Sequence, residues 1–284
     1  MIFPRSLRRL ILTNRWTLVG FTRIGSWRTC GPMAIRYEQV SGHVVVITID
    51  RPERRNALDL DHMRQLGDAW RRFAADPNNW VAVITGVGRA FCAGADLAAS
   101  FPSGHLNAQD ALSAVGVNND GQPDGVLFDW LLKGLELHKP IIAVVNGPCV
   151  AGGFELLAGT DIRLATKHAR FGLTEPRRSL MVGGGSAVRL PRQLTWSVAM
   201  EFLLTGEAVS AKRVRQLGLL NEIVLEEQLM KRSRERTGHI ARNAPLSIRA
   251  TKESVAKFGG TKHAGCVRAR DRDCNARRRQ QGLD

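Results

Sequence analysis

Two glutamates, Glu155 and Glu175, lie 20 residues apart, each in a mainly apolar stretch that contains glycine. Glu155 belongs to CVAGGFELLAGTD, where an apolar strand is expected to turn into an apolar helix. Two carboxylates that converge on one site can serve as an acid and a base, because their proximity separates their pKa values. Each also has a structural interpretation: Glu155 as an exposed helix residue, and Glu175 as the ion-pair partner of Arg177 or Arg178.

Two stretches of small residues supply candidate backbone donors. Ala93, Gly94 and Ala95 follow the end of a predicted strand, where small side chains let a ligand approach the backbone. Gly152 and Gly153 are expected at a helix N-terminus, whose first N–H groups are unpaired and attract negative charge. Two such donors on facing loops would form an oxyanion hole. Glycines are also common in turns, so either stretch alone has a structural interpretation.

Several other kinds of site are disfavoured. The run GGGSAV lacks the GK[ST] ending of a phosphate-binding loop, and no GxSxG motif marks a serine nucleophile. The five cysteines form no CxxC pair, and their odd number does not suit a disulfide framework. Both features favour a reducing compartment. Cys92 is either a reactive thiol or a buried one. No metal is expected, since the histidines lack ligand spacing: His43, His62, His105, His138, His168, His239 and His263.

Strands and helices alternate around these residues. β-branched and apolar runs predict strands at HVVVITIDRP, WVAVITG, PIIAVVNG and DIRLAT. Helices are expected at DLDHMRQLGDAWRRFAADP, capped by Asp59 or Asp61, at GVLFDWLLKGLEL and at GGFELLAGT. Residues 100–125 resemble a long mobile surface segment, and the sequence from Trp196 is mainly helical apart from LLNEIV. This alternation predicts an α/β fold with repeated βαβ units.

Taken together, these stretches closely resemble one family, the crotonase (enoyl-CoA hydratase/isomerase) superfamily. The matching stretches, in this order and spacing, are RPERRNALD, GVGRAFCAGADL, KPIIAVVNGPCVAGGFELLAGTDIRLAT and ARFGLTEP, followed by TGEAVSAKRVRQLGLLNEIV. The resemblance runs from about Ile35 to Phe258. It implies an α/β, crotonase-like spiral of repeated ββα units with a C-terminal helical region. It also implies an acyl-CoA thioester substrate and assembly as a homotrimer or homohexamer.

The resemblance also implies roles for particular residues. The N–H groups of Ala95 and Gly152 would form the oxyanion hole for the thioester carbonyl, and Glu155 and Glu175 match the family's two catalytic glutamates. Hydration of a 2-enoyl thioester needs water at C3, a proton at C2 and stabilised charge on the thioester oxygen, so we expect an enoyl-CoA hydratase. No cofactor is expected, because CoA is part of the substrate. The CoA would lie against Ala93, Gly94 and Asp96.

Departures from the family pattern leave alternatives open. Pro176, Arg177 and Arg178 follow the second glutamate, where hydratases more often have an apolar residue next, so an enoyl-CoA isomerase or another acyl-CoA lyase or hydrolase is an alternative. After Phe258 the sequence is Arg-rich and has no aromatic residue, so we expect disorder, and a truncated or frame-shifted end would impair the protein. An RNA-binding homologue is the alternative from another class.

Charge and composition define the expected domains. Of the net charge of +15, residues 1–33 carry +6 and residues 259–284 carry +4, so nucleic-acid binding by the body is not expected. No apolar run reaches the roughly 18–20 residues of a membrane span. We expect an extraneous or presequence-like extension at 1–33, a crotonase core at 34–225, a helical region at 226–258 and a disordered basic tail at 259–284. A cytoplasmic protein is expected, or a mitochondrial-matrix one if 1–33 is a genuine presequence.

Overall fold

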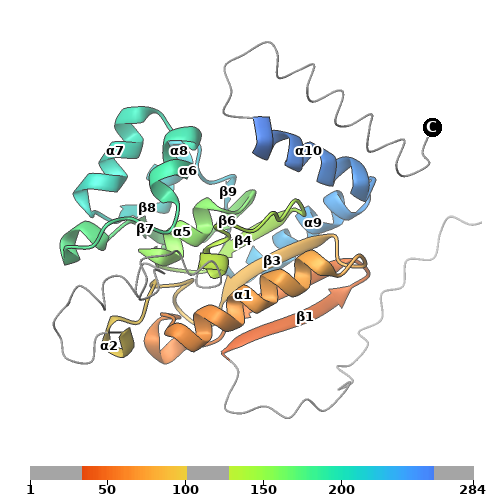
Figure 1. Cartoon of the computed structure of the whole chain (residues 1–284), viewed down its shortest axis with the longest axis horizontal. Coiled ribbons are helices and arrows are strands. Elements are labelled where there is room, and N and C mark those ends of the chain that lie inside the picture. Colours follow the sequence, from red (N-terminus) through yellow and green to blue (C-terminus); the bar gives the residue numbers. More distant parts are fainter. Residues whose placement is uncertain (1–33, 101–127, 259–284) are drawn as a thin grey trace, which may run out of the picture. The chain divides into compact units, whose positions relative to one another are not determined.

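The computed structural model describes residues 34–100 and 128–258, drawn in colour in Figure 1. The expectations for 1–33 and 259–284, and for nearly all of the proposed surface segment at 100–125, fall outside the described residues. Within the described ranges, no helix is long and apolar enough to cross a membrane.

The larger sheet has six strands, in the order β1 (Ile35–Ser41), β2 (Val44–Ile49), β3 (Val81–Gly86), β4 (Ile141–Val145), β6 (Ile162–Ala165) and β9 (Glu222–Ile223). The first pair is antiparallel, and every other pair is parallel. β2 and β4 are buried along their whole length, as expected for strands of a parallel sheet covered on both faces.

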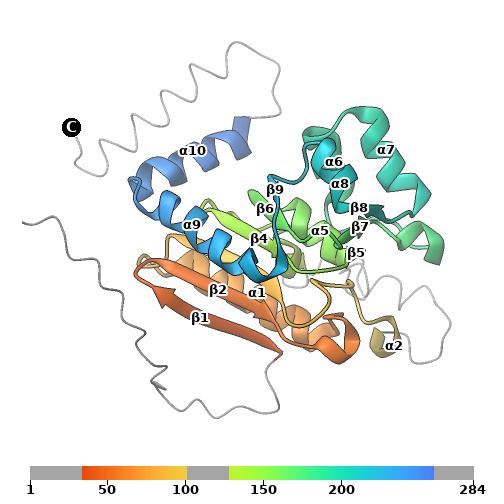
Figure 2. The same ribbon diagram turned by 180° about the vertical axis from the view of Figure 1, so that it is seen from behind.

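Helices cover both faces of this sheet. Figures 1 and 2 show α1 (Leu60–Ala75) on one face and α9 (Leu229–Ala241) on the other. Alternate residues of β2 therefore enter two separate apolar clusters, one shared with α1 and one shared with α9. The predicted cap of α1 is confirmed, because the Asp59 carboxylate accepts the N–H groups of Asp61 and His62.

A second, smaller sheet is made of β5 (Cys149–Val150), β7 (Arg170–Gly172) and β8 (Val209–Ser210). The chain passes repeatedly from the larger sheet to the smaller one and then into a helix. It runs from β4 through β5 into α5 (Gly152–Ala158), and from β6 through β7 to α6 (Ser186–Gln193). This is the predicted ββα repeat, and the α/β fold class is confirmed.

The predicted change to mainly helical structure after Trp196 is confirmed, but the helix predicted at GVLFDWLLKGLEL ends earlier than expected. In the described part of GVLFDWLLKGLEL, Phe128 is helical and the 3-10 helix η2 (Asp129–Leu131) follows it. The chain then leaves the helix, because Leu132 and Gly134 adopt positive φ angles of 57° and 86°. The remaining helices are η1 (Pro52–Arg54), α2 (Leu97–Ser100), η3 (Glu175–Arg178), α7 (Trp196–Thr205), α8 (Ala211–Gln216), η4 (Glu226–Gln228) and α10 (Pro245–Phe258).

Candidate active site

The backbone N–H of Ala95 is available to a ligand. Leu58 N donates to Gly94 O at 2.8 Å, and Asp96 N donates to Leu58 O at 2.8 Å, which makes a parallel bridge between Leu58 and Ala95. In a parallel bridge, the residues on either side of Ala95 make the hydrogen bonds to Leu58, so the N–H of Ala95 itself points away from Leu58. Ala95 lines a cavity, and its N–H has no acceptor among the described residues.

A second available N–H belongs to Gly152, the first residue of α5. The first N–H groups of a helix have no intrahelical acceptor. Ala151 before it adopts φ 51° and ψ −133°, a strained region for an L-residue that sets the direction of the turn. A Cβ on Gly94 would lie 2.8 Å from Gly152 N, so the loop and the turn touch. The two N–H groups are therefore placed to bind one negatively charged oxygen.

Glu155 lies in the first turn of α5 and is 4% exposed. Its Oε1 accepts the N–H of Ser186 at 3.1 Å, and its Oε2 accepts the N–H of Gly184 at 3.0 Å. Burial raises the pKa of Glu155, while these two N–H groups and the charges of Arg189 and Lys133 act to lower it. The carboxylate is thus fixed in orientation by groups that favour its ionised form.

The glycine run that contains Gly184 leaves room for this carboxylate. A Cβ on Gly184 would overlap both Oε2 of Glu155 and the Leu131 side chain. Gly185, with φ 121°, then leads into α6, whose N-terminal partial charge also favours an anion. The sequence excluded a phosphate-binding loop here but did not identify the role that the run has. The sequence signal that could have identified this role is a glycine run at the start of a helix, after a glutamate in an apolar stretch.

Glu175 begins η3 and is 9% exposed. Its Oε2 is buried and has no hydrogen-bond partner among the described residues. Burial and the like charge of Glu155 raise the pKa of Glu175 to about 7. The alternative ion pair of Glu175 with Arg177 or Arg178 does not form. Arg177 pairs instead with Glu207, with 3.6 Å between Nη2 and Oε1, and Arg178 makes no ion pair in the described part of the chain. Glu175 can therefore hold a proton near neutral pH.

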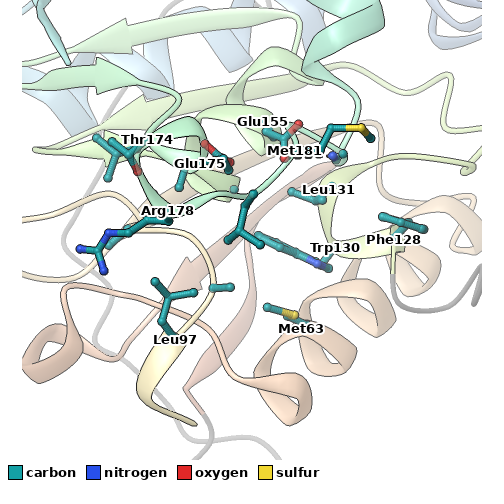
Figure 3. A pocket seen from close by; sticks show the side chains of 18 residues that line it. Met63, Leu97, Phe128, Trp130, Leu131, Glu155, Thr174, Glu175, Arg178 and Met181 are labelled. Atoms are coloured by element: carbon teal, nitrogen blue, oxygen red, sulfur yellow. Dashed lines mark hydrogen bonds between the residues drawn. The ribbon is translucent and has the colours of Figure 1, made fainter. Parts of the chain in front are cut away.

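The two glutamates line one cavity of about 280 Å³. Figure 3 shows both carboxylates along one side of it and the Trp130 ring facing them. Apart from these carboxylates and Arg178, the side chains that line it are mainly apolar. A mainly apolar cavity with a few polar groups is typical of a small-molecule site. The apolar walls include Met63, Leu97, Phe128, Trp130, Leu131 and Leu180.

The three predicted CoA contacts have different surroundings. Ala93 lines the cavity, and Gly94, with φ 87°, shapes the loop beside it. Asp96 is buried outside the cavity lining, where it accepts from Arg51 Nη1 at 2.8 Å and from the N–H of Ala99 at 3.3 Å. Asp96 therefore holds the loop in place, and its contact with CoA stays a prediction.

Arg189 joins the wall of the cavity at η2 to α5. Its Nη1 donates to Leu131 O at 2.9 Å and to Glu155 O at 3.1 Å, and its Nη2 donates to Leu132 O at 2.6 Å. The guanidinium thus ties η2 to α5 from its own position on α6. Sequence reasoning did not identify this residue, because its partners are backbone carbonyls in distant segments.

Cys92 lies beside the site. Cys92 is fully buried, and burial raises the pKa of its thiol to about 12, so the buried-thiol interpretation holds. No group of histidine, cysteine, aspartate or glutamate suited to a metal ion occurs in the described ranges.

The chain is similar to proteins of one family. The family model described as enoyl-CoA hydratase/isomerase matches residues 39–264. Enoyl-CoA hydratase EchA19 of Mycobacterium tuberculosis is 40% identical over 75% of this chain and 77% of its own length. The (E)-benzylidenesuccinyl-CoA hydratase of Thauera aromatica is 38% identical over 76% and 80%. A crystal structure of enoyl-CoA hydratase from Bacillus anthracis superposes with a TM-score of 0.76, at 28% identity, over 88% of this chain and 94% of that chain.

Proposed function

Because the chain belongs to the enoyl-CoA hydratase/isomerase family, we propose that it hydrates a 2-enoyl-CoA thioester in the cavity shared by Glu155 and Glu175. The observation that carries this proposal is the contrast between the two carboxylates. Glu155 accepts two backbone N–H groups, whereas Glu175 has a pKa of about 7 and an unpartnered Oε2. Two carboxyl groups with such different hydrogen-bond partners can act as base and acid in one step.

In this mechanism the thioester carbonyl oxygen accepts the N–H groups of Ala95 and Gly152. Negative charge moves onto this oxygen when a nucleophile adds to C3, and the two donors stabilise that charge. Removal of one donor of this kind costs about 3–4 kcal/mol of transition-state stabilisation in other enzymes. The donors belong to backbone fixed by the bridge at Leu58 and by the start of α5, so they need no reorganisation during the reaction.

The glutamates complete the proton balance. The Glu155 carboxylate takes a proton from water as the water oxygen bonds to C3. Glu175 gives its proton to C2 as the charge on the thioester oxygen returns to form the carbonyl. The product is a 3-hydroxyacyl-CoA, and proton exchange with solvent returns both glutamates to their starting states. CoA is part of the substrate, and we propose no separate cofactor.

The adenosine end of CoA would lie near Ala93 and Gly94, with Asp96 supporting the loop. Assembly as a homotrimer or homohexamer in the cytoplasm is part of the proposal. Large apolar side chains exposed on η3–α7 support a subunit interface: Met181 is 75%, Trp196 70% and Leu204 71% exposed. Sedimentation at several protein concentrations would test it, and a monomer throughout would refute it.

The experiment that tests the reaction is incubation with 2-enoyl-CoA thioesters in oxygen-labelled water. Hydration places one labelled oxygen in an intact CoA thioester. An isomerase would move the double bond without incorporating label, and a hydrolase would place label in a free acid and release CoA. Either of these results would refute the proposed hydration. The matched control for glutamate variants is Glu201→Gln, because Glu201 is exposed on α7 and outside this cavity.

A further inference from the structure

Arg178 is the only positively charged residue among the described residues that line the catalytic cavity. It ends η3, the short helix that begins with Glu175. Its guanidinium makes no hydrogen bond or ion pair within the ranges that the structure describes. The neighbouring Arg177 differs, because it pairs with Glu207 and does not line the cavity. An arginine without a protein partner at the wall of a ligand cavity is available to the ligand.

The position of Arg178 separates its charge from the catalytic carboxylates. Figure 3 shows its side chain running away from Glu155 and Glu175. The charges that act to lower the pKa of Glu155 belong to Arg189 and Lys133 instead. Arg178 is therefore not the counter-ion of the reacting groups. A guanidinium is permanently charged and has five N–H donors in a planar fork, which suits a carboxylate or a phosphate.

The position along the chain favours a carboxylate over the phosphates of CoA. Three residues of a 3-10 helix advance by about 6 Å, so the backbone of Arg178 lies close to that of Glu175. The phosphates of CoA are separated from the thioester by the whole pantetheine arm. By contrast, when the double bond lies at Glu175, the part of the acyl chain beyond it comes within reach of Arg178. Leu97 and Leu180 also line the cavity and would contact the methylene groups between the two ends.

We propose that Arg178 determines substrate specificity by binding a carboxylate at the far end of the acyl chain. The preferred substrates are then 2-enoyl-CoA thioesters that carry this second acidic group. The inference rests on the proposed function, because that function places the thioester at Ala95 and Gly152. The pairing is a charge-assisted hydrogen bond at the edge of the apolar cavity, formed with the substrate before and during the reaction.

The test compares pairs of 2-enoyl-CoA thioesters with equal chain length, one ending in a methyl group and one in a carboxylate. The wild-type protein should have the higher kcat/KM for the carboxylate-ended member. Arg178→Met should lower kcat/KM for that member about 10- to 100-fold, mainly through KM, because a hydrogen bond to a charged group is lost. The methyl-ended member should change by less than about threefold, and Arg178→Lys should retain part of the preference. Arg177→Met is the control for loss of a neighbouring charge.

Two results would overturn the inference. One is an equal loss on both thioesters, or weaker binding of free CoA by Arg178→Met, either of which would assign the charge to CoA. The other is a wild-type protein without preference for the carboxylate. Calorimetry can measure the binding of the saturated analogues of both thioesters, one ending in a methyl group and one in a carboxylate. Because these analogues cannot be hydrated, their affinities test the inference separately from the reaction. A carboxylate preference that disappears in Arg178→Met supports the inference even if no thioester is hydrated. Hydration of the methyl-ended thioester without that preference overturns it alone.

Discussion

Replacement of Glu175 by glutamine should raise the stability of the protein relative to the wild type progressively as the pH rises. Burial and Glu155 raise the pKa of Glu175 from 4.5 to about 7. A carboxyl group with a raised pKa in the folded state binds its proton more tightly there than in the unfolded chain. Its contribution to stability is therefore present below about pH 4.5 and is lost as the pH rises to about 7. The glutamine variant has no such loss, because its amide does not titrate.

The magnitude follows from the shift. A rise from 4.5 to about 7 corresponds to about 3–4 kcal/mol, at ~1.4 kcal/mol per pKa unit. This is the upper limit of the pH-dependent difference in unfolding free energy between Glu175→Gln and the wild type. The absolute stability of the variant also depends on how the buried amide is hydrogen-bonded. The informative quantity is therefore the change of the difference with pH.

The assay is urea unfolding between about pH 4.5 and pH 8.5, at one protein concentration because oligomers depend on it. The free energy of unfolding of Glu175→Gln minus that of the wild type should rise with pH over this range. Glu201→Gln, which changes an exposed glutamate on α7, is the matched control. A constant difference for Glu175→Gln would refute the reasoning, since Glu175 would then titrate as an ordinary carboxyl group.

Three further predictions concern the surroundings of the site. Gly184→Ala should lower kcat about 100-fold, because the added methyl group displaces the Glu155 carboxylate. Arg189→Met should raise the pKa of Glu155, so the acidic limb of the pH dependence of kcat should move to higher pH, with partial recovery in Arg189→Lys. Cys92 and Cys149, both buried thiols with raised pKa values, should react with iodoacetamide only after unfolding, as counted by mass spectrometry.

Each of these predictions has a control or a contradicting result. Gly238→Ala places a methyl group in α9, where the nearest atom is the end of a flexible side chain at 3.7 Å, so kcat should stay near that of the wild type. An unchanged kcat in Gly184→Ala would contradict the role given to that glycine. Arg192→Met removes an exposed charge from the same helix as Arg189 and should leave the pH dependence unchanged. Alkylation of either cysteine in the folded protein would contradict its burial.

The sequence predicted local structure where the signal was local. The Asp59 cap and the spacing of Met63, Leu66, Trp70 and Phe73 suffice for α1, since all of these interactions lie within one helix. β1 was not predicted, because its residues are mostly polar and its pairing with β2 supplies the order. The helix predicted through Asp129 ends early because Leu132 adopts a positive φ, which its residue type does not predict.

The candidate site was predictable only in part. The spacing of Glu155 and Glu175 suggested a pair, and the family resemblance supplied their roles. Their environments depend on contacts between distant segments. Ser186 lies 31 residues beyond Glu155 and donates to it, and Arg189 reaches carbonyls 58 and 57 residues earlier in the chain. Such contacts follow from how the ββα repeats stack, which no short stretch of sequence encodes.

The most direct test of the account is the rate of 2-enoyl-CoA hydration by the wild type, Glu155→Gln, Glu175→Gln and the double variant. Each single change should lower kcat at least about 100-fold, since each removes one of two required proton transfers. The double variant should lose little more than the worse single variant, because the two residues act as a unit. If either single variant kept kcat within about tenfold of the wild type while folded and able to bind CoA thioesters, the two-glutamate mechanism would be contradicted.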